Sequence, residues 1–322
     1  MRVLLTGIGG FVAAHLTARL LADGHEVFGS VRGSTAVAGA VALRLGLPAD
    51  HVLTADVNNA AAIAAVVRRA QPEGLFHLAA VTSVPASLAD PEQTYTTNLL
   101  GSLKVLAAVR DAASRCRILC VGSSDAYGSV EPEELPVTET QAFRPLSPYG
   151  VSKAAADLAA YQWWRAHGLD IVRLRPFSHT GPGQAPRFVC ADLARQVVDV
   201  ERGRSRPCVE VGNLDVVRDF TDVRDVVRAY VLAWQHGDSG AAYNVCSGTG
   251  RTPRQIIDAL LGLSGVDATV VVQPARQRAT DVKVLVGSAA KLQRATGWSA
   301  AIPWEETLRD LLDDWRARQQ PA

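Results

Sequence analysis

This sequence lacks an excess of charge of one sign, cysteines spaced as pairs, and long apolar runs. The formal net charge is +1 and the basic residues are scattered, so nothing marks a surface for nucleic acid or an anionic membrane. The five cysteines form no CxxC pair and no His/Cys metal spacing, and their odd number argues against a disulfide framework. The apolar run at the amino terminus is too short for a signal peptide or a membrane span. We therefore expect a cytoplasmic protein that binds no metal and acts on a small molecule.

The chain does have enough apolar residues for a large core, and they recur in a regular order. Of its 322 residues, 48% are hydrophobic, which suits one domain or two intimately joined domains. Short apolar runs alternate with longer alanine-rich amphipathic segments, a pattern that predicts an α/β fold with a Rossmann-type, doubly wound parallel sheet. We expect strands at 2–6, 26–31, 51–55, 74–79, 117–122 and 170–175, and helices at 11–23, 59–70, 91–113 and 149–167.

The pattern changes after Pro176, where a loop rich in glycine and proline begins. A helix near 188–202, strands near 208–211 and 242–245, and two terminal helical runs follow. We interpret this part as a smaller C-terminal cap over the carboxyl ends of the strands. The expected division is a dinucleotide-binding domain over 1–175 and, over 176–322, mainly a substrate-binding cap with some segments that return to the first domain.

A glycine-rich turn links the first predicted strand to the first predicted helix. In "LLTGIGGFVAAHL", Gly7 permits a tight turn, Gly10 lets the backbone approach a pyrophosphate, and Ala13 is the third small residue, where helix and strand pack closely. The spacing is GxxGxxA. A purely structural role for the glycines is the alternative, and the position at a strand-to-helix junction favours dinucleotide binding.

The residues after the second predicted strand bear on the choice of dinucleotide. An NAD site usually has a carboxylate here for the ribose 2′-hydroxyl, whereas this chain has Arg32, whose fork of donors suits a 2′-phosphate. We therefore predict NADP(H), with a solvated surface arginine as the alternative. Asp56, after the third strand, is a candidate adenine contact or the N-cap of the next helix, and both roles are compatible.

Tyr149 and Lys153 are separated by one helical turn in "SPYGVSK". With six tyrosines and so few lysines in the chain, about 0.07 such pairs are expected by chance. Side chains at i and i+4 share a helical face, so the ammonium is expected to lower the pKa of the phenol and prepare it for acid/base chemistry. A structural tyrosine beside a solvated lysine is the alternative.

A serine at the end of the fifth predicted strand completes the candidate catalytic set. Ser123, in "LCVGSSDAYG", lies at the carboxyl edge of the sheet, where its hydroxyl is able to bind the same substrate oxygen as Tyr149. Serines are common in such loops, so this interpretation depends on the Tyr–Lys pair. We assign no role to His179 or Cys190.

Several segments together resemble the extended short-chain dehydrogenase/reductase family, which acts on nucleotide sugars with a Ser/Thr-Tyr-Lys triad. In the first half they are "TGIGGFVA", "FHLAA", "GSSDAYG" and "SPYGVSK". In the second half they are "RPFSHTGPGQ", "VGNLDVVRDFTDVRDVVRAY", "AYNVCSG" and "LVGSAAKLQRATGWSAAIPWEETL". The latter are similar to the branch that holds GDP-mannose 4,6-dehydratases and, more closely, GDP-4-dehydro-6-deoxy-D-mannose reductases, which form GDP-D-rhamnose.

The resemblance implies roles for further residues. Cofactor contacts are expected, besides Arg32, Asp56, Tyr149 and Lys153, from Gly7, Gly10, Phe11, Val12, Val57, Leu78, Ala79, Ala80 and Pro176. Substrate contacts are expected from Ser83, Asp125, Ser178, Arg218 and Arg278, with the two arginines on the diphosphate or ribose. Arg224 and Arg228 fit a salt-bridged, solvated face better. Ser178 replaces an expected Asn and Ala279 an expected Pro, which puts the identity of the sugar in question.

Three reactions suit this residue set. A reductase would add hydride from NADPH to C4 of a 4-keto-6-deoxy sugar while Tyr149 donates the proton. A 4-epimerase would oxidise and re-reduce C4. A 4,6-dehydratase also needs a carboxylate to remove the C5 proton. At that position the family has a Glu, whereas this chain has Asp125, which is one methylene shorter. We favour the reductase acting on a GDP-linked sugar; a non-catalytic NADP-binding protein is the alternative from another class. By resemblance, the helices at 91–113 and 149–167 are expected to form a homodimer.

Overall fold

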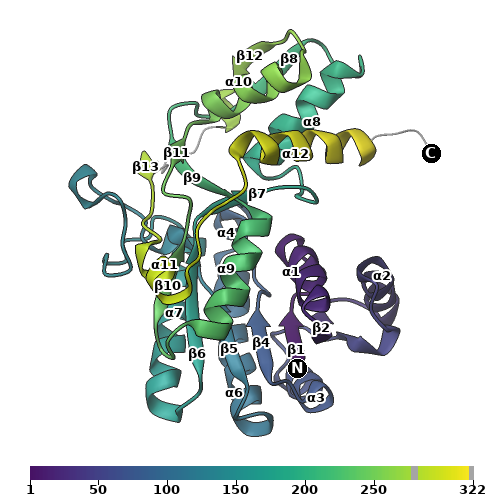
Figure 1. The fold of residues 1–322 in the computed structure, drawn as a ribbon, viewed down its shortest axis with the longest axis vertical. Helices are drawn as coiled ribbons and strands as arrows, with labels where there is room; N and C mark the ends of the chain where they lie inside the picture. Colours follow the sequence, from purple (N-terminus) through teal and green to yellow (C-terminus); the bar gives the residue numbers. More distant parts are fainter. Residues whose placement is uncertain (277–281, 319–322) are drawn as a thin grey trace.

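A parallel sheet forms the centre of the molecule in the computed structural model, which describes residues 1–276 and 282–318 (Figure 1). The seven strands of this sheet follow the order β10 (Ala242–Val245), β6 (Ile171–Pro176), β5 (Arg117–Val121), β4 (Gly74–His77), β1 (Arg2–Thr6), β2 (Glu26–Val31) and β3 (Val52–Thr54). The strand order reverses between β1 and β4, and all neighbouring strands are parallel. The predicted Rossmann-type fold is confirmed, with the crevice of such sheets at the carboxyl ends of β1 and β4.

Alternate residues of each strand supply two separate cores, one on each face of the sheet. Val3 and Leu5 point to one face, and Leu4, between them, points to the other. The first face is covered by α1 (Phe11–Ala22), α2 (Thr35–Leu45), α9 (Val223–His236) and α11 (Ala290–Thr296). The second face is covered by α3 (Ala60–Ala70), α6 (Gly101–Ala112) and α7 (Pro148–His167). Because helices cover both faces, the strands are apolar on both sides.

The helices of the model agree with several predictions and differ from others. Those predicted at 11–23, 59–70 and 149–167 are confirmed as α1, α3 and α7. The helix predicted at 91–113 consists of α5 (Pro91–Tyr95), a π-helical turn (Thr96–Leu100) and α6. Neither α2 nor α9 was predicted, and a short α4 (Val84–Ala89) precedes α5. Across the described ranges, no helix has the length and apolar character needed to span a membrane.

A second, smaller group of elements lies beyond the carboxyl ends of the strands, at the top of Figure 1. Its core joins α8 (Val189–Glu201), α10 (Pro253–Ser264) and α12 (Trp304–Arg318) with the strand pair β8 (Cys208–Val211) and β12 (Thr269–Val272). Below it, β9 (Val217–Asp222) pairs with β7 (Ser178–Thr180), β11 (Gly250–Arg251) and β13 (Val284–Leu285). The strand at 242–245, which we had assigned to the cap, pairs instead with β6 as the edge of the large sheet.

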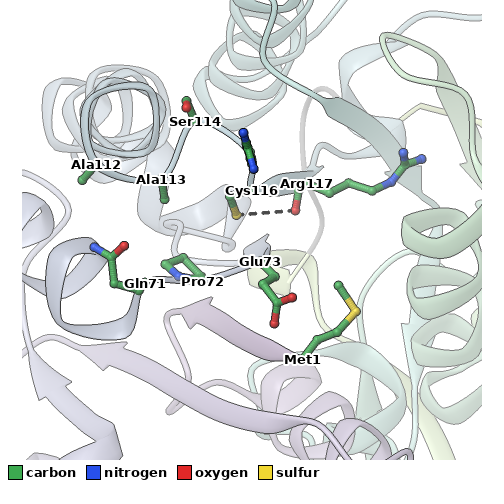
Figure 2. Close-up of a pocket in the computed structure, with 10 residues that line it drawn as sticks. Met1, Gln71, Pro72, Glu73, Ala112, Ala113, Ser114, Cys116 and Arg117 are labelled. Carbon is green, nitrogen blue, oxygen red and sulfur yellow. Dashed lines mark hydrogen bonds between the residues drawn. The ribbon is translucent and has the colours of Figure 1, made fainter.

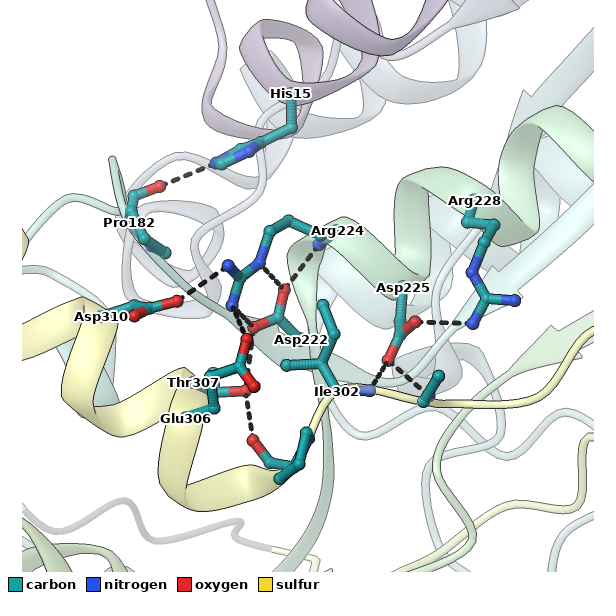
Figure 3. Close-up of polar contacts among 12 residues, drawn as sticks. His15, Pro182, Asp222, Arg224, Asp225, Arg228, Ile302, Glu306, Thr307 and Asp310 are labelled. Carbon is teal, nitrogen blue, oxygen red and sulfur yellow. Dashed lines mark hydrogen bonds and ion pairs between the residues drawn. The ribbon is translucent and has the colours of Figure 1, made fainter.

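The junction of β9 and α9 connects this smaller group to the rest of the molecule (Figure 3). Asp222 is buried, and its carboxylate accepts hydrogen bonds from Arg224 and from the Thr307 hydroxyl of α12 at 2.8 Å. Asp225, one helical turn further, accepts from the backbone N–H groups of Ala301 and Ile302. The expected salt bridges of Arg224 and Arg228 are present, and through Asp222 and Asp225 they help to anchor the carboxyl-terminal segment.

Candidate active site

The glycine turn leaves the amino terminus of α1 open to a ligand. Gly7 has φ 71°, and a Cβ at this position would lie 2.8 Å from Ala79 Cα, so only glycine fits. Gly10 is the N-cap residue of α1 and has no side chain to bond the first N–H groups of the helix. Phe11 and Val12 begin the helix. Backbone donors at the positive end of a helix dipole form an anion site suited to a pyrophosphate.

Arg32 follows β2 directly and is exposed beside the start of α2. Within the described parts of the chain it forms no hydrogen bond or ion pair. Gly33 has φ 130°, and Ser34 caps α2 by accepting a hydrogen bond from the N–H of Val37. Arg44, near the end of α2, donates to the Gly9 carbonyl at 3.0 Å and so ties this helix to the glycine turn. The end of β2 therefore offers a cation, and no carboxylate, to the ribose of a dinucleotide.

The segments after β3 and β4 line the same edge of the sheet. Asp56 accepts a hydrogen bond from the N–H of Asn58 at 2.8 Å. The prediction that Asp56 caps the next helix is wrong, because Asn59 is the N-cap residue of α3 and accepts from Ala62. Val57 is buried and the Asn58 amide donates to the Thr97 hydroxyl at 3.2 Å, so the backbone and the Asp56 carboxylate are the polar groups left for a ligand at the start of this turn.

A buried network of polar groups holds the segment after β4. The Thr6 hydroxyl accepts hydrogen bonds from the N–H groups of Leu78 and Ala79, both at 3.2 Å. The two ring nitrogens of His77 lie 2.7 Å from Thr6 Oγ1 and 2.8 Å from Ser102 Oγ. Burial, and secondly the positive charge of Lys153, lower the pKa of His77 to about 3, so its ring is neutral. This network fixes the backbone from Leu78 to Ala80 beside the glycine turn.

The first two turns of α7 carry Tyr149 and Lys153. Ser147 caps the helix by accepting a hydrogen bond from the N–H of Gly150, and Pro148 occupies the first helical position. Tyr149 and Lys153 are both buried on one face of the helix, with 8% and 7% of their surface exposed. Lys153 Nζ donates to the Val121 carbonyl at the end of β5, at 2.8 Å. The side chains that the sequence analysis paired therefore share one buried site.

Ser123 and Asp125 meet the first turn of α7 from the end of β5. Ser123 Oγ accepts a hydrogen bond from the N–H of Asp125 at 3.1 Å. A Cβ on Gly150 would lie 2.6 Å from the Asp125 carbonyl oxygen, so glycine allows this turn and α7 to touch. The Ser123 hydroxyl is a hydrogen-bond partner of the Tyr149 phenol. The predicted catalytic residues are thus adjacent at the carboxyl edge of the sheet.

The protonation of this pair differs from the expectation. Burial, and then the Asp125 carboxylate, raise the pKa of Tyr149 above its usual value, and the hydrogen bond from Ser123 acts in the opposite direction. Burial also lowers the pKa of Lys153 to about 8. Lys153 does not lower the pKa of Tyr149 as we expected, because burial dominates and its ammonium is directed to the Val121 carbonyl. At neutral pH the phenol is therefore protonated, which is the form that donates a proton.

One buried residue beside this site was not identified by the sequence analysis. Asn98 lies in the π-helical turn between α5 and α6 and is 2% exposed. Its side chain accepts from the Val81 N–H at 2.7 Å and donates to the Val81 carbonyl and to Ser152 Oγ, both at 2.9 Å. Ser152 is in α7 between Tyr149 and Lys153. Asn98 thereby fixes the segment after β4 against the helix that carries the candidate proton donor. π-Turns are often found at functional sites.

Of the predicted substrate residues, Ser178 and Arg218 lie on two paired strands, and Ser83 lies at the start of α4. Ser83 is the N-cap residue of α4 and accepts from Ala86. Ser178 of β7 pairs in register with Phe220 of β9, and Arg218 lies two residues before Phe220, about 7 Å along the strand. Arg251 of β11 is directly opposite Arg218 and was not predicted. Pro176 ends β6, and Arg278 lies outside the described residues.

A cavity of about 560 Å³ at the other end of the sheet is not part of this site (Figure 2). It lies at the amino-terminal ends of β1, β4 and β5, and its lining includes Met1, Pro72, Glu73 and Arg117. Doubly wound sheets bind ligands at the carboxyl ends of their strands. The glycine turn, Ser123 and Tyr149 all lie at those ends.

Comparison with known proteins agrees with this arrangement. The chain matches the model of the GDP-mannose 4,6 dehydratase family over residues 4–311. It is 40% identical over 247 residues to GDP-6-deoxy-D-mannose reductase of Pseudomonas aeruginosa, covering 77% of this chain and 81% of that protein. It is 30% identical to UDP-glucose 4-epimerase of Streptomyces lividans, covering 98% and 95%. The structure of RMD from Pseudomonas aeruginosa complexed with NADPH superimposes with TM-score 0.86 and 34% identity, covering 99% and 100%. The chain therefore belongs to the GDP-mannose 4,6-dehydratase family.

Proposed function

We propose that this protein is an NADPH-dependent reductase that converts the C4 keto group of GDP-4-dehydro-6-deoxy-D-mannose, or a closely similar nucleotide sugar, to an alcohol. The observation that carries the proposal is the protonated Tyr149 beside Ser123, at the same edge of the sheet as a glycine turn and Arg32. The similarity to GDP-6-deoxy-D-mannose reductase supports this choice among the reactions of the family.

The groups present fit an NADP(H) molecule. The open amino terminus of α1, begun by Phe11 and Val12, would hold the pyrophosphate, and Arg32 would pair with the 2′-phosphate. Asp56 and Val57 would contact the adenine, and the backbone from Leu78 to Ala80 would line the path to the nicotinamide. When bound, the reduced cofactor supplies the hydride that reaches C4.

The protein's own residues would complete the reduction by moving a proton. As the keto oxygen gains negative charge, Tyr149 donates its phenolic proton to it, and the Ser123 hydroxyl holds the same oxygen in place. Lys153, cationic below about pH 8, stabilises the phenolate that remains and would bind the nicotinamide ribose. The Tyr149 phenolate then takes a proton from solvent, which restores the acid for the next turnover.

The proposed substrate contacts come from two arginines and three smaller polar residues. Arg218 and Arg278 would bind the diphosphate or ribose, because their guanidinium groups match phosphate geometry. Ser83, Asp125 and Ser178 would contact the sugar. Ser178 pairs with β9 close to Arg218, so its side chain would help to determine which hexose binds.

The second candidate is 4,6-dehydration, and it rests on Asp125. This carboxylate raises the pKa of Tyr149, and it lies at the position where the dehydratases have a Glu. It is one methylene shorter, which moves the base away from the C5 proton and favours the reductase. A 4-epimerase is the third possibility, since UDP-glucose 4-epimerases are also similar to the chain.

A substrate comparison tests these proposals. Purified protein is incubated with NADPH and GDP-4-dehydro-6-deoxy-D-mannose, with GDP-mannose, or with UDP-glucose, and products are identified by mass spectrometry. We expect loss of reduced-nicotinamide absorbance with the keto sugar alone. A keto sugar formed from GDP-mannose would identify a dehydratase, and UDP-galactose formed from UDP-glucose would identify an epimerase.

We also propose that the enzyme works as a homodimer in the cytoplasm. Apolar side chains are exposed on neighbouring parts of the π-turn and α7, namely Leu100, Val151, Leu158 and Tyr161, with Leu158 58% exposed. All five cysteines are free thiols, which suits a reducing compartment. A mass near 34 kDa by light scattering at micromolar concentration would contradict the dimer.

A further inference from the structure

A second cavity, of about 600 Å³, lies at the β10 edge of the large sheet, apart from the candidate active site. The start of β10, the segment 138–140, the helix α11 and two buried arginines of β6 surround it. Its polar lining residues are Thr138, Glu139, Thr140, Arg173, Arg175, Ser288, Lys291 and Arg294. Its volume is that of a site for a small molecule.

The charges around this cavity do not balance. Arg173 and Arg175 both pair with one carboxylate, that of Asp157 in α7. Lys291 and Arg294 have no carboxylate within ion-pair distance among the described residues. Among the described residues that line the cavity, Glu139 is the one acid, and one of its oxygens already accepts the N–H of Asn244. Asp238, just before the lining residue Gly240, also acts on Lys291, so four cations face three carboxylates and the cavity keeps an excess of positive charge.

The positive field reaches the bottom of the cavity. Arg173 and Arg175 are 8% and 6% exposed, and the Nε of Arg173 has no acceptor among the described residues. Burial lowers the pKa of Lys291, and so do the charges of Arg173 and Arg175, whereas the carboxylates of Glu139 and Asp238 raise it. Lys291 Nζ lies 4.9 Å from the ring centre of Tyr243, which holds it on the wall of the cavity. An anion placed there would gain charge-assisted hydrogen bonds from Lys291 and Arg294 and would lie in the field of the two buried arginines, whose Arg173 Nε–H is still without an acceptor among the described residues.

We infer that this cavity is a binding site for a small molecule that carries phosphate groups. Guanidinium and ammonium donors are the usual partners of phosphate oxygens, and the hydroxyls of Thr138, Thr140 and Ser288 add neutral donors around them. None of the residues assigned to the cofactor or the substrate lines this cavity. The site is therefore additional to the proposed active site and does not rest on the proposed function.

The second cavity is connected through Asp157 with α7, the helix that carries Tyr149 and Lys153. Asp157, which holds both buried arginines, lies one helical turn after Lys153 and two turns after Tyr149 on α7. Arg175 also donates to the Tyr127 hydroxyl at 3.0 Å. A phosphate that draws on these guanidinium groups competes with Asp157 for them.

Calorimetric titration of the whole protein with inorganic pyrophosphate, at fixed ionic strength, tests the site. The double variant Lys291→Gln/Arg294→Gln removes two cations and keeps much of the length of both side chains. The matched control is Arg254→Gln/Arg309→Gln, which removes two exposed cations from α10 and α12 with the same change of net charge. Arg218→Gln reports pyrophosphate bound at the proposed substrate site. Melting curves of all variants confirm that they fold.

We expect Lys291→Gln/Arg294→Gln to weaken pyrophosphate binding at least tenfold, and Lys291→Arg to retain it. The control pair and Arg218→Gln should each keep the affinity of this site. Equal binding by the Lys291/Arg294 variant and the control would overturn the inference. Loss of all binding in Arg218→Gln, or no binding by the unmodified protein, would overturn it as well.

Discussion

Replacing Arg32 should change which dinucleotide the enzyme prefers. Arg32 is exposed at the end of β2, no described residue competes for its donors, and no carboxylate stands there for a ribose 2′-hydroxyl. Hydrogen bonds to charged groups contribute about 1.5–3 kcal/mol. Because Arg32 is exposed to solvent, we take the lower value, and about 1.5 kcal/mol corresponds to roughly a tenfold change in affinity.

Two substitutions separate loss of attraction from gain of a new contact. Arg32→Ser should raise the KM for NADPH about tenfold and leave that for NADH nearly unchanged. Arg32→Asp should raise the KM for NADPH further through repulsion of the 2′-phosphate, and should lower that for NADH because the carboxylate accepts from the 2′-hydroxyl. Steady-state kinetics with both cofactors measure these values.

The matched control is Arg19→Ser on α1, which removes the same charge from an exposed arginine paired with Asp23. It should leave both KM values unchanged. If Arg32→Ser keeps the same preference for NADPH over NADH as the unmodified protein, Arg32 does not bind the 2′-phosphate, and the assignment of NADP(H) loses its physical basis.

Three further predictions concern α7. Tyr149→Phe should lower kcat by about 10²–10⁴, the usual contribution of a general acid, while the melting temperature stays close to that of the unmodified protein; activity that survives in this variant would exclude the phenol as proton donor. Burial lowers the pKa of Lys153 to about 8, so its charge is lost above that pH and kcat should fall there; Lys153→Met should remove this limb of the pH profile, and a limb that persists would assign it to another group. Since the unfolded chain keeps its proton up to about pH 10, the free energy of unfolding should also rise between about pH 8 and 10 relative to the Met variant. Asp157→Asn should destabilise the protein by about 3–5 kcal/mol in urea unfolding because two buried guanidinium groups lose their carboxylate, whereas Asp111→Asn, at an exposed pair, should change little.

Features set by short stretches of chain were predictable from the sequence. The turn between the first strand and the first helix is marked by Gly7, because its positive φ is a local backbone requirement that favours glycine. Tyr149 and Lys153 share a face because a spacing of four residues always does so on a helix. Ser123 follows a buried strand, and strand ends meet at one edge of a parallel sheet.

Features set by contacts between distant segments were not predictable. The β10 strand looks like any short apolar run, and only its register with β6 assigns it to the large sheet. The helix α2 buries only Ala38 and Ala42, which gives it little apolar pattern to detect. Asn98 depends on a π-turn inside a helix that the sequence shows as continuous.

The direction in which the pKa of Tyr149 shifts was also not predictable from the sequence. The Lys153 ammonium alone lowers the pKa of a nearby phenol, but burial of the phenol acts in the opposite direction and is the larger effect. The degree of burial follows from how β5, α7 and the elements above the sheet pack together, and no spacing in the sequence records it.

Transfer of deuterium from the cofactor tests the central claim most directly. NADPH that carries deuterium on the transferred position is incubated with the protein and GDP-4-dehydro-6-deoxy-D-mannose, and the product sugar is examined by mass spectrometry and NMR. The reductase proposed here places the deuterium on C4 and makes the product one mass unit heavier than that formed with ordinary NADPH. A product without deuterium at C4, or a keto sugar recovered unchanged, would contradict it.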